Sequence, residues 1–203
     1  MDDVPEETNW LKRAGRAKIT YPNGDYFQGQ INQDKQKHGH GKYVWVETVE
    51  DEVKEIASYD GEYVNSKKEG LGKMIFPNGD SYHGMWKNDV MEGDGTFMYA
   101  NGDIFSGNFV NGIKQGQGTY EFKADKSQLV GEWKTGTIVT GTWRFADGGS
   151  YAGEFEDGKP IGTGAFKFSN GFHQEGEYAK LEAEDTGPAR QWTGGSIVKI
   201  PVA

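Results

Sequence analysis

The feature that most constrains this chain is a glycine that returns every 23 residues. Steps of 23 residues from Gly72 lead to further glycines, namely Gly95, Gly118, Gly141, Gly164 and Gly187. The upstream copies of this marker position are Gly41 and Ala17, since GRAKITYPNGD (15–25) aligns with GLGKMIFPNGD (70–80). Glycine accounts for 31 of the 203 residues, so six glycines in one register do not arise by chance. A fixed period of this length indicates a row of repeated supersecondary units.

The residues that follow each of these marker glycines alternate in polarity. The second and fourth residues are apolar or aromatic, as in Met74/Phe76 and Phe97/Tyr99, and the residues between them are mostly polar. Alternation with a period of two predicts a strand with one buried face.

A turn and a second strand complete each unit. Pro-Asn-Gly-Asp at 22–25 and again at 77–80 predicts a tight turn, because Asn-Gly tolerates positive φ. The motif aromatic-x-Gly-x-aromatic follows, as in Tyr82-Gly84-Trp86. We expect a ring of the next hairpin to lie over the bare glycine backbone. Each unit is therefore predicted to be one β-hairpin.

The predicted fold class is all-β, an elongated single-layer array of stacked antiparallel β-hairpins with a period of 23 residues. Only 34% of the residues are hydrophobic, whereas 13% are aromatic. Such a chain cannot build a thick aliphatic core and must bury rings instead.

The pattern Tyr-x-Gly-x-Trp-x-x-Gly-x-x-x-Gly-x-Gly resembles the MORN repeat. FSGNFVNGIKQGQG (105–118) and YAGEFEDGKPIGTG (151–164) match it throughout, and the resemblance extends over about residues 15–187. It implies a scaffold made of hairpins. The unit at 129–141 departs from the pattern, because Val139 replaces the first glycine of Gly-x-Gly. A local irregularity of the sheet is expected there.

The closing segments SNGFHQEGEY (169–178) and WTGGSIVKI (192–200), after a short all-MORN body, are similar to the MORN subunits of the radial spoke head of motile cilia. This resemblance implies a place in the axoneme.

Three regions are distinguished along the chain. Residues 1–14 are expected to form a flexible arm, residues 15–187 the MORN-repeat domain, and residues 188–203 a tail that caps the last strand or binds a partner. Residues 45–59 interrupt the period and carry the acids Glu50-Asp51-Glu52. We interpret them as a long hairpin with an acidic tip, with a short helix as the alternative.

Charge and composition restrict the partners. The formal net charge is −9, which argues against nucleic acid and makes an anionic membrane surface an unlikely partner. There is no cysteine, so no disulfide framework or thiolate zinc site is expected. No secretory signal or membrane-spanning segment is expected either. A soluble protein of the cytoplasm and cytoskeleton is predicted.

The sequence offers little reactive chemistry. His38-x-His40 has no cysteine or third ligand nearby in the sequence, so we expect no metal and no cofactor. Asp25, Asp80, Asp103 and Asp147 recur at the turns and are predicted to cap their own turns. No helix is expected after the Gly-x-Gly pairs, which therefore do not indicate a nucleotide site. The chain is not expected to be an enzyme.

A one-layer sheet cannot bury both of its faces, so some rings should contact a partner. The rings that follow the marker glycine at the second position are expected to form the core. The partner-binding aromatic face is assigned to second-strand rings, namely Tyr63, Trp86, Phe109, Trp133, Phe155 and Tyr178.

Two functions are weighed. The first is a non-catalytic scaffold of the radial spoke head in the ciliary or flagellar axoneme, contributing to motility. Its partners would be other spoke head proteins, with a homodimer or a paralogue pair as a further option. The second is a membrane-associated adaptor that binds anionic phospholipids through its MORN repeats, which the negative charge disfavours.

Overall fold

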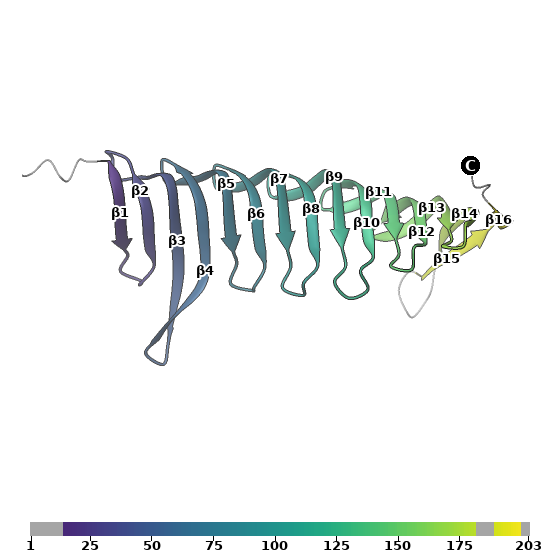
Figure 1. Ribbon diagram of the computed structural model, residues 1–203, viewed down its shortest axis with the longest axis horizontal. Helices are drawn as coiled ribbons and strands as arrows, with labels where there is room; N and C mark the ends of the chain where they lie inside the picture. Colours follow the sequence, from purple (N-terminus) through teal and green to yellow (C-terminus); the bar gives the residue numbers. More distant parts are fainter. Residues whose placement is uncertain (1–13, 182–188, 200–203) are drawn as a thin grey trace, which may run out of the picture. The chain divides into compact units, whose positions relative to one another are not determined.

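The computed structural model describes residues 14–181 and 189–199, and these residues form strands joined by turns (Figure 1). No helix occurs among them, and so none that could cross a bilayer. The all-β prediction is confirmed. The chain divides into two compact units, Met1–Ala100 and Asn101–Ala203, which are described in turn. The predicted arm, residues 1–14, lies almost wholly outside the described residues.

The first unit is an open sheet in which each strand pairs antiparallel with the next one along the chain (Figure 1). Its strands are β1 (Gly15–Thr20), β2 (Tyr26–Ile31), β3 (Lys37–Val49), β4 (Glu52–Val64), β5 (Lys67–Ile75), β6 (Ser81–Lys87) and β7 (Val90–Met98).

The second unit repeats this arrangement. Its strands are β8 (Ile104–Val110), β9 (Ile113–Glu121), β10 (Gln128–Lys134), β11 (Thr137–Arg144), β12 (Ser150–Glu156), β13 (Lys159–Lys167), β14 (Phe172–Leu181), β15 (Ala189–Gly194) and β16 (Val198–Lys199). Both β15 and β16 pair with β14, and they follow one another along it. The end of the predicted tail thus covers β14, and residues 182–188 and 200–203 lie outside the described part.

Two kinds of turn alternate along the chain. In the Pro-Asn-Gly-Asp turns only the glycine has positive φ, as at Gly24 (φ 89°), so the asparagine does not share the left-handed conformation. In the turns that lead to the next repeat after β4, β6, β8, β10 and β12, both central residues have positive φ, as at Asn65 (48°) and Ser66 (69°). This is the geometry of a two-residue type I′ hairpin turn. Between β2 and β3, by contrast, only Lys35 has positive φ.

A β-bulge interrupts the strand that carries each Gly-x-Gly. Gly70 has φ 64°, and the pairing of β4 with β5 shifts register between Gly61 and Tyr63. Between β10 and β11 the first glycine is replaced by Val139, and a smaller shift occurs between Glu132 and Trp133. The irregularity that the sequence predicts at Val139 is therefore present as a narrower bulge.

The core consists of second-strand rings lying over glycines. Tyr59 is fully buried, and a Cβ built on Gly61 or Gly72 would lie 2.6 or 2.3 Å from its hydroxyl oxygen. Since Gly61 pairs with Gly72, one ring covers the glycines of two adjacent strands. The ring comes from the same strand as Gly61, and the expectation that the next hairpin supplies it is wrong here.

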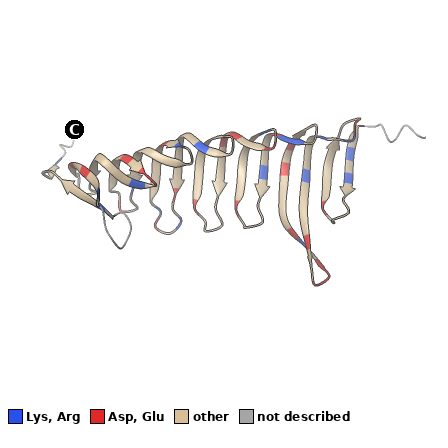
Figure 2. Cartoon of the chain, turned by 180° about the vertical axis from the view of Figure 1, so that it is seen from behind, with Lys and Arg blue, Asp and Glu red and all other residues tan. Residues whose placement is uncertain are grey.

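Residues 45–59 lie in strands β3 and β4, which extend beyond the neighbouring hairpins in Figure 1. Glu50 and Asp51 form the connecting turn, with φ of 52° and 63°. The short helix considered as an alternative is therefore wrong. The tip is acidic, as the red segment at the end of this hairpin shows in Figure 2.

Candidate protein-binding face

Five of the six rings predicted to meet a partner are buried within the protein. Tyr63, Trp86, Phe109, Trp133 and Phe155 are 3–5% exposed, and Tyr178 is half-buried. The expectation that these five rings form an open aromatic surface is therefore wrong.

The buried rings reach back toward the preceding hairpin. The ring of Trp86 meets that of Tyr59 edge-to-face at 5.3 Å, and its Nε1 donates a hydrogen bond to the Gly72 carbonyl at 3.2 Å. Trp133 repeats the bond in the second unit, to the Gly118 carbonyl at 3.1 Å. The sequence pattern shows that the tryptophan is repeated. It does not show in which direction the tryptophan side chain points, because this depends on the bend of the strand at its glycines.

A different set of rings is partly open. These rings occupy the second and fourth positions after the marker glycines. The rings at the second position were expected to be buried in the core. The rings at both positions are half-buried, and within each unit we call this set the ring face: Tyr43, Trp45, Phe76, Phe97 and Tyr99 in the first unit, and Tyr120, Phe122, Trp143, Phe145, Phe166 and Phe168 in the second. Neighbouring members contact each other, as in the stacked pair Phe76 and Phe97 at 5.8 Å. Partly exposed rings in a row provide apolar area and edges for a bound chain.

Three lysines lie over aromatic rings, some buried and some of the ring face, and each comes four residues before a marker glycine. The Nζ of Lys37 is 4.6 Å from the ring centre of Tyr43, that of Lys68 is 4.6 Å from Trp86, and that of Lys114 is 4.8 Å from Trp133. These distances are within the range of cation–π attraction. We call Lys37, Lys68 and Lys114 the ring lysines.

Partial burial lowers the pKa of all three ring lysines, because their ammonium groups lose water. The nearby negative charge of the Asp89 carboxylate raises the pKa of Lys37 and Lys68 and so partly offsets the effect of burial. Among the described residues neither of these two lysines has a carboxylate within 4.0 Å. A carboxylate from a bound partner would therefore find two incompletely compensated cations.

Each unit has a hollow on this face. In the first unit it has a volume of about 320 Å³ and is lined by Lys37, Lys68, Trp45 and Asp89, among others. In the second unit a hollow of about 300 Å³ lies between Lys114 and Asp157. Both combine rings, one or two lysines and an acid, which suits a peptide segment better than a reaction centre.

The turn aspartates join successive repeats. The Asp103 carboxylate accepts hydrogen bonds from the Lys123 backbone N–H and the Tyr120 hydroxyl, both at 2.8 Å, and Asp25 does the same with Val46 and Tyr43. Within their own turns these two carboxylates accept only from the side chains of Asn23 and Asn101, both at 2.9 Å. The prediction that they cap their own turns is therefore wrong for the backbone donor, which lies in the next repeat. It holds for Asp147, which accepts from Gly149 N–H at 2.9 Å.

These bonds change the acidity of the groups involved. The backbone bond from Lys123 is the main reason why the pKa of Asp103 lies below its usual value, and the bond from Val46 has the same effect on Asp25. Burial, followed by the bond to Asp25, raises the pKa of Tyr43 to about 12.

The histidines form no metal site among residues 14–181 and 189–199, where no group of three His, Cys, Asp or Glu side chains is placed to hold an ion. His40 instead lies 3.2 Å from the Asp60 carboxylate through its Nε2.

A sequence profile of the MORN repeat matches six stretches that together cover more than half of the chain: 12–26, 27–47, 59–81, 82–104, 105–124 and 151–172. The chain belongs to the MORN-repeat family. The profile leaves out residues 125–150, the region of the narrower bulge at Val139. Membership in this family indicates a repeat scaffold.

No curated protein matches the chain. One solved structure similar to this MORN protein is the SAS-4 (dCPAP) TCP domain in complex with a proline-rich motif of Ana2 (dSTIL) from Drosophila melanogaster. The two chains are 17% identical, with a TM-score of 0.48, and the match covers 86% of this chain and 92% of that chain. Similarity at this level says nothing about what the present chain binds.

Proposed function

We propose that this MORN protein is a structural scaffold that holds a segment of a partner protein against the ring face. The observation that carries the proposal is the placement of the ring lysines beside partly open rings. Lys37, for example, lies 4.6 Å from the ring centre of Tyr43, in the hollow that also contains Lys68 and Trp45. The segment that fits has apolar side chains for the rings and a carboxylate for the lysines.

We further propose that the assembly is the radial spoke head of motile cilia or flagella, and that the partners are other spoke head subunits. This part rests on the resemblance of the closing segments, 169–178 and 192–200, to spoke head MORN subunits. On this proposal the protein would belong to the cytoskeleton of the axoneme and contribute to motility.

Ciliated cells that express the tagged full chain test both parts. We expect proximity labelling to mark spoke head proteins, and we expect the protein to stay with axonemes after a salt wash. If the protein leaves salt-washed axonemes while other spoke proteins remain, the spoke assignment is wrong.

The double variant Lys37→Met/Lys68→Met tests the ring face itself. It should reduce labelling of the partner several-fold, because the carboxylate of the bound segment loses its cations. Lys87→Met/Lys134→Met removes two exposed lysines elsewhere and should leave labelling unchanged. Equal labelling by all three proteins would contradict a role for the ring lysines while leaving the axonemal location to be judged separately.

A further inference from the structure

The face of the first unit opposite to its rings carries a group of cations. Strand residues alternate between faces, so the residues next to the marker positions point away from the ring face. On β1 these are Arg16 and Lys18, on either side of Ala17, and on β3 they are His40 and Lys42, on either side of Gly41. Figure 2 shows basic segments on these N-terminal strands.

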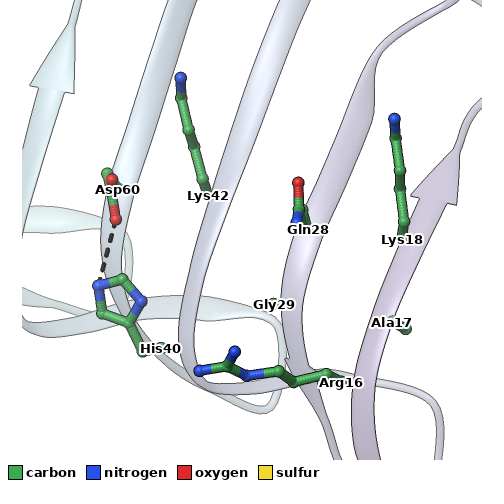
Figure 3. Close-up of a pocket in the computed structure, with 8 residues that line it drawn as sticks. All are labelled: Arg16, Ala17, Lys18, Gln28, Gly29, His40, Lys42 and Asp60. Atoms are coloured by element: carbon green, nitrogen blue, oxygen red, sulfur yellow. Dashed lines mark ion pairs between the residues drawn. The ribbon is translucent and has the colours of Figure 1, made fainter.

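The pairing of the strands brings these side chains into one row. Lys18 pairs with Gln28, Gln28 with Lys42, and Lys42 with Asp60. Arg16 lies one row further along β1. Figure 3 shows Lys18, Gln28 and Lys42 extending in the same direction, with Arg16 crossing below them toward His40.

These residues surround a hollow of about 440 Å³, and the backbone at Ala17 and Gly29 belongs to its lining. Within the described residues no carboxylate lies within 4.0 Å of Arg16, Lys18 or Lys42. The one acid in the lining, Asp60, is engaged by His40. We call Arg16, Lys18 and Lys42 the outer cations.

Folding does not require these charges. The residue after the marker position is Lys18, Lys42 and Lys73 in the first three repeats, whereas the corresponding residues later in the chain are Thr96, Thr119, Thr142 and Ala165. All seven positions lie in strands of the same kind, so a threonine or alanine serves the sheet as well. A cluster of cations in a protein of net charge −9 therefore points to an anionic ligand.

We propose that the outer cations bind an acidic peptide segment of a partner protein, at a site separate from the ring face. Lys18 and Lys42 are two strands apart, so their Cα atoms are about 10 Å from one another. This spacing corresponds to about three residues of an extended chain, so it suits carboxylates spread along a peptide better than a single small anion. Asp60 and Glu62 on the neighbouring strand β4 are exposed, and they would repel a broad polyanion such as a membrane or a nucleic acid duplex.

The test uses the full chain and a fluorescent, glutamate-rich peptide whose polarization reports binding. Arg16→Gln/Lys18→Gln/Lys42→Gln should weaken binding about tenfold, since three charge contacts are lost. The control Lys87→Gln/Lys134→Gln/Lys159→Gln removes the same charge from exposed positions and should keep the affinity within about twofold. Lys18→Arg/Lys42→Arg should retain binding and shows that the strands tolerate substitution.

Three results would overturn the proposal. One is an equal loss in the outer triple variant and in its control, which indicates a general charge effect. Another is loss of peptide binding in Lys37→Met/Lys68→Met, which moves the site to the ring face. The third is failure of the peptide to bind while vesicles containing phosphatidylserine or a short RNA duplex bind through the outer cations. In the supporting case, amide NMR shifts on peptide addition concentrate at Ala17, Gly29 and Gly41.

Discussion

The ring of Tyr59 lies directly over the backbone of Gly72, so that a Cβ on this glycine would be 2.3 Å from the tyrosine hydroxyl oxygen. The same relationship recurs between Tyr82 and Gly95 at 2.4 Å and between Tyr151 and Gly164 at 2.3 Å. The glycine that recurs every 23 residues thus leaves room for a buried ring, which lies where a Cβ would otherwise be. Its register is set by contact with a side chain, and at Gly72, Gly95 and Gly164 the backbone φ is not in the left-handed region.

Gly72→Ala should lower the free energy of unfolding by about 1–3 kcal/mol, because the new methyl group forces Tyr59 out of its place. Urea unfolding measures the change. Ala17 occupies the same register on β1 and already has a Cβ, so Ala17→Gly is the control. That change should stay within about 1 kcal/mol. An unchanged urea midpoint for Gly72→Ala would show that the Tyr59 ring can move aside without lowering the free energy of unfolding.

Trp86→Phe should lower the free energy of unfolding by about 1–3 kcal/mol, because the buried Gly72 carbonyl loses the donor at 3.2 Å. Trp45 is half-buried and shows no hydrogen bond from its indole to another described residue. Trp45→Phe should therefore change stability by much less. Equal effects of the two substitutions would mean that lost ring area, and not the hydrogen bond, determines the result.

Lys68→Met should leave the free energy of unfolding within about 1 kcal/mol of the parent. Lys68 pairs with Tyr63, and in the next repeat Met91 takes the equivalent place beside Trp86. Methionine also relieves the partial burial of a charge. Thermal melting measures this change, and a drop of several degrees would show that the cation–π contact with Trp86 dominates. The same variant then serves in binding experiments as a folded protein.

Asp103→Asn should destabilise the protein at pH 7 by about 1–3 kcal/mol, because the amide cannot replace both carboxylate bonds. The pKa of Asp103 is lower in the folded protein than its usual value of 3.8. Its contribution is therefore complete above the unfolded pKa and is lost as the pH falls through the folded one. We expect the difference between parent and variant to shrink below about pH 4.

Asp147→Asn is the matched control for this experiment, because the carboxylate of Asp147 accepts a hydrogen bond within its own turn, from the Gly149 N–H. It should change stability less at pH 7. Urea midpoints between pH 2.5 and 7 record both variants. A loss for Asp103→Asn that is the same at every pH would contradict the linkage.

The repeat and its hairpins could be predicted from the sequence because alternation and glycine register are local patterns. The direction of the rings could not, since Tyr63 and Trp86 show the same alternation whether they point at a partner or at Tyr59. The direction of the rings depends on the bend of the strand at residues such as Gly70, with φ 64°. This bend results from a β-bulge, which the 23-residue period does not predict. The partners of Asp103 were missed for a related reason, as its donors lie in the next repeat.

The outer cations could not be predicted from the sequence either, because they are not adjacent in the chain. Arg16 and Lys18 are separated from Lys42 by a whole hairpin, and only the pairing of β1, β2 and β3 unites them. Clusters of this kind depend on the pairing register of neighbouring strands. The 23-residue period defines this register only approximately near Gly41, because an insertion follows it.

The bond between Asp25 and the N–H of Val46 spans 21 residues, and this has a consequence for synthesis. The ribosome synthesises Asp25 before Val46. The Asp25 carboxylate therefore cannot accept its hydrogen bond from the Val46 N–H until the following hairpin has been synthesised. The same delay recurs from Asp80 to Ala100 and from Asp103 to Lys123. Each newly emerged hairpin is therefore completed by its successor, and folding during translation advances in steps of one repeat behind the growing end.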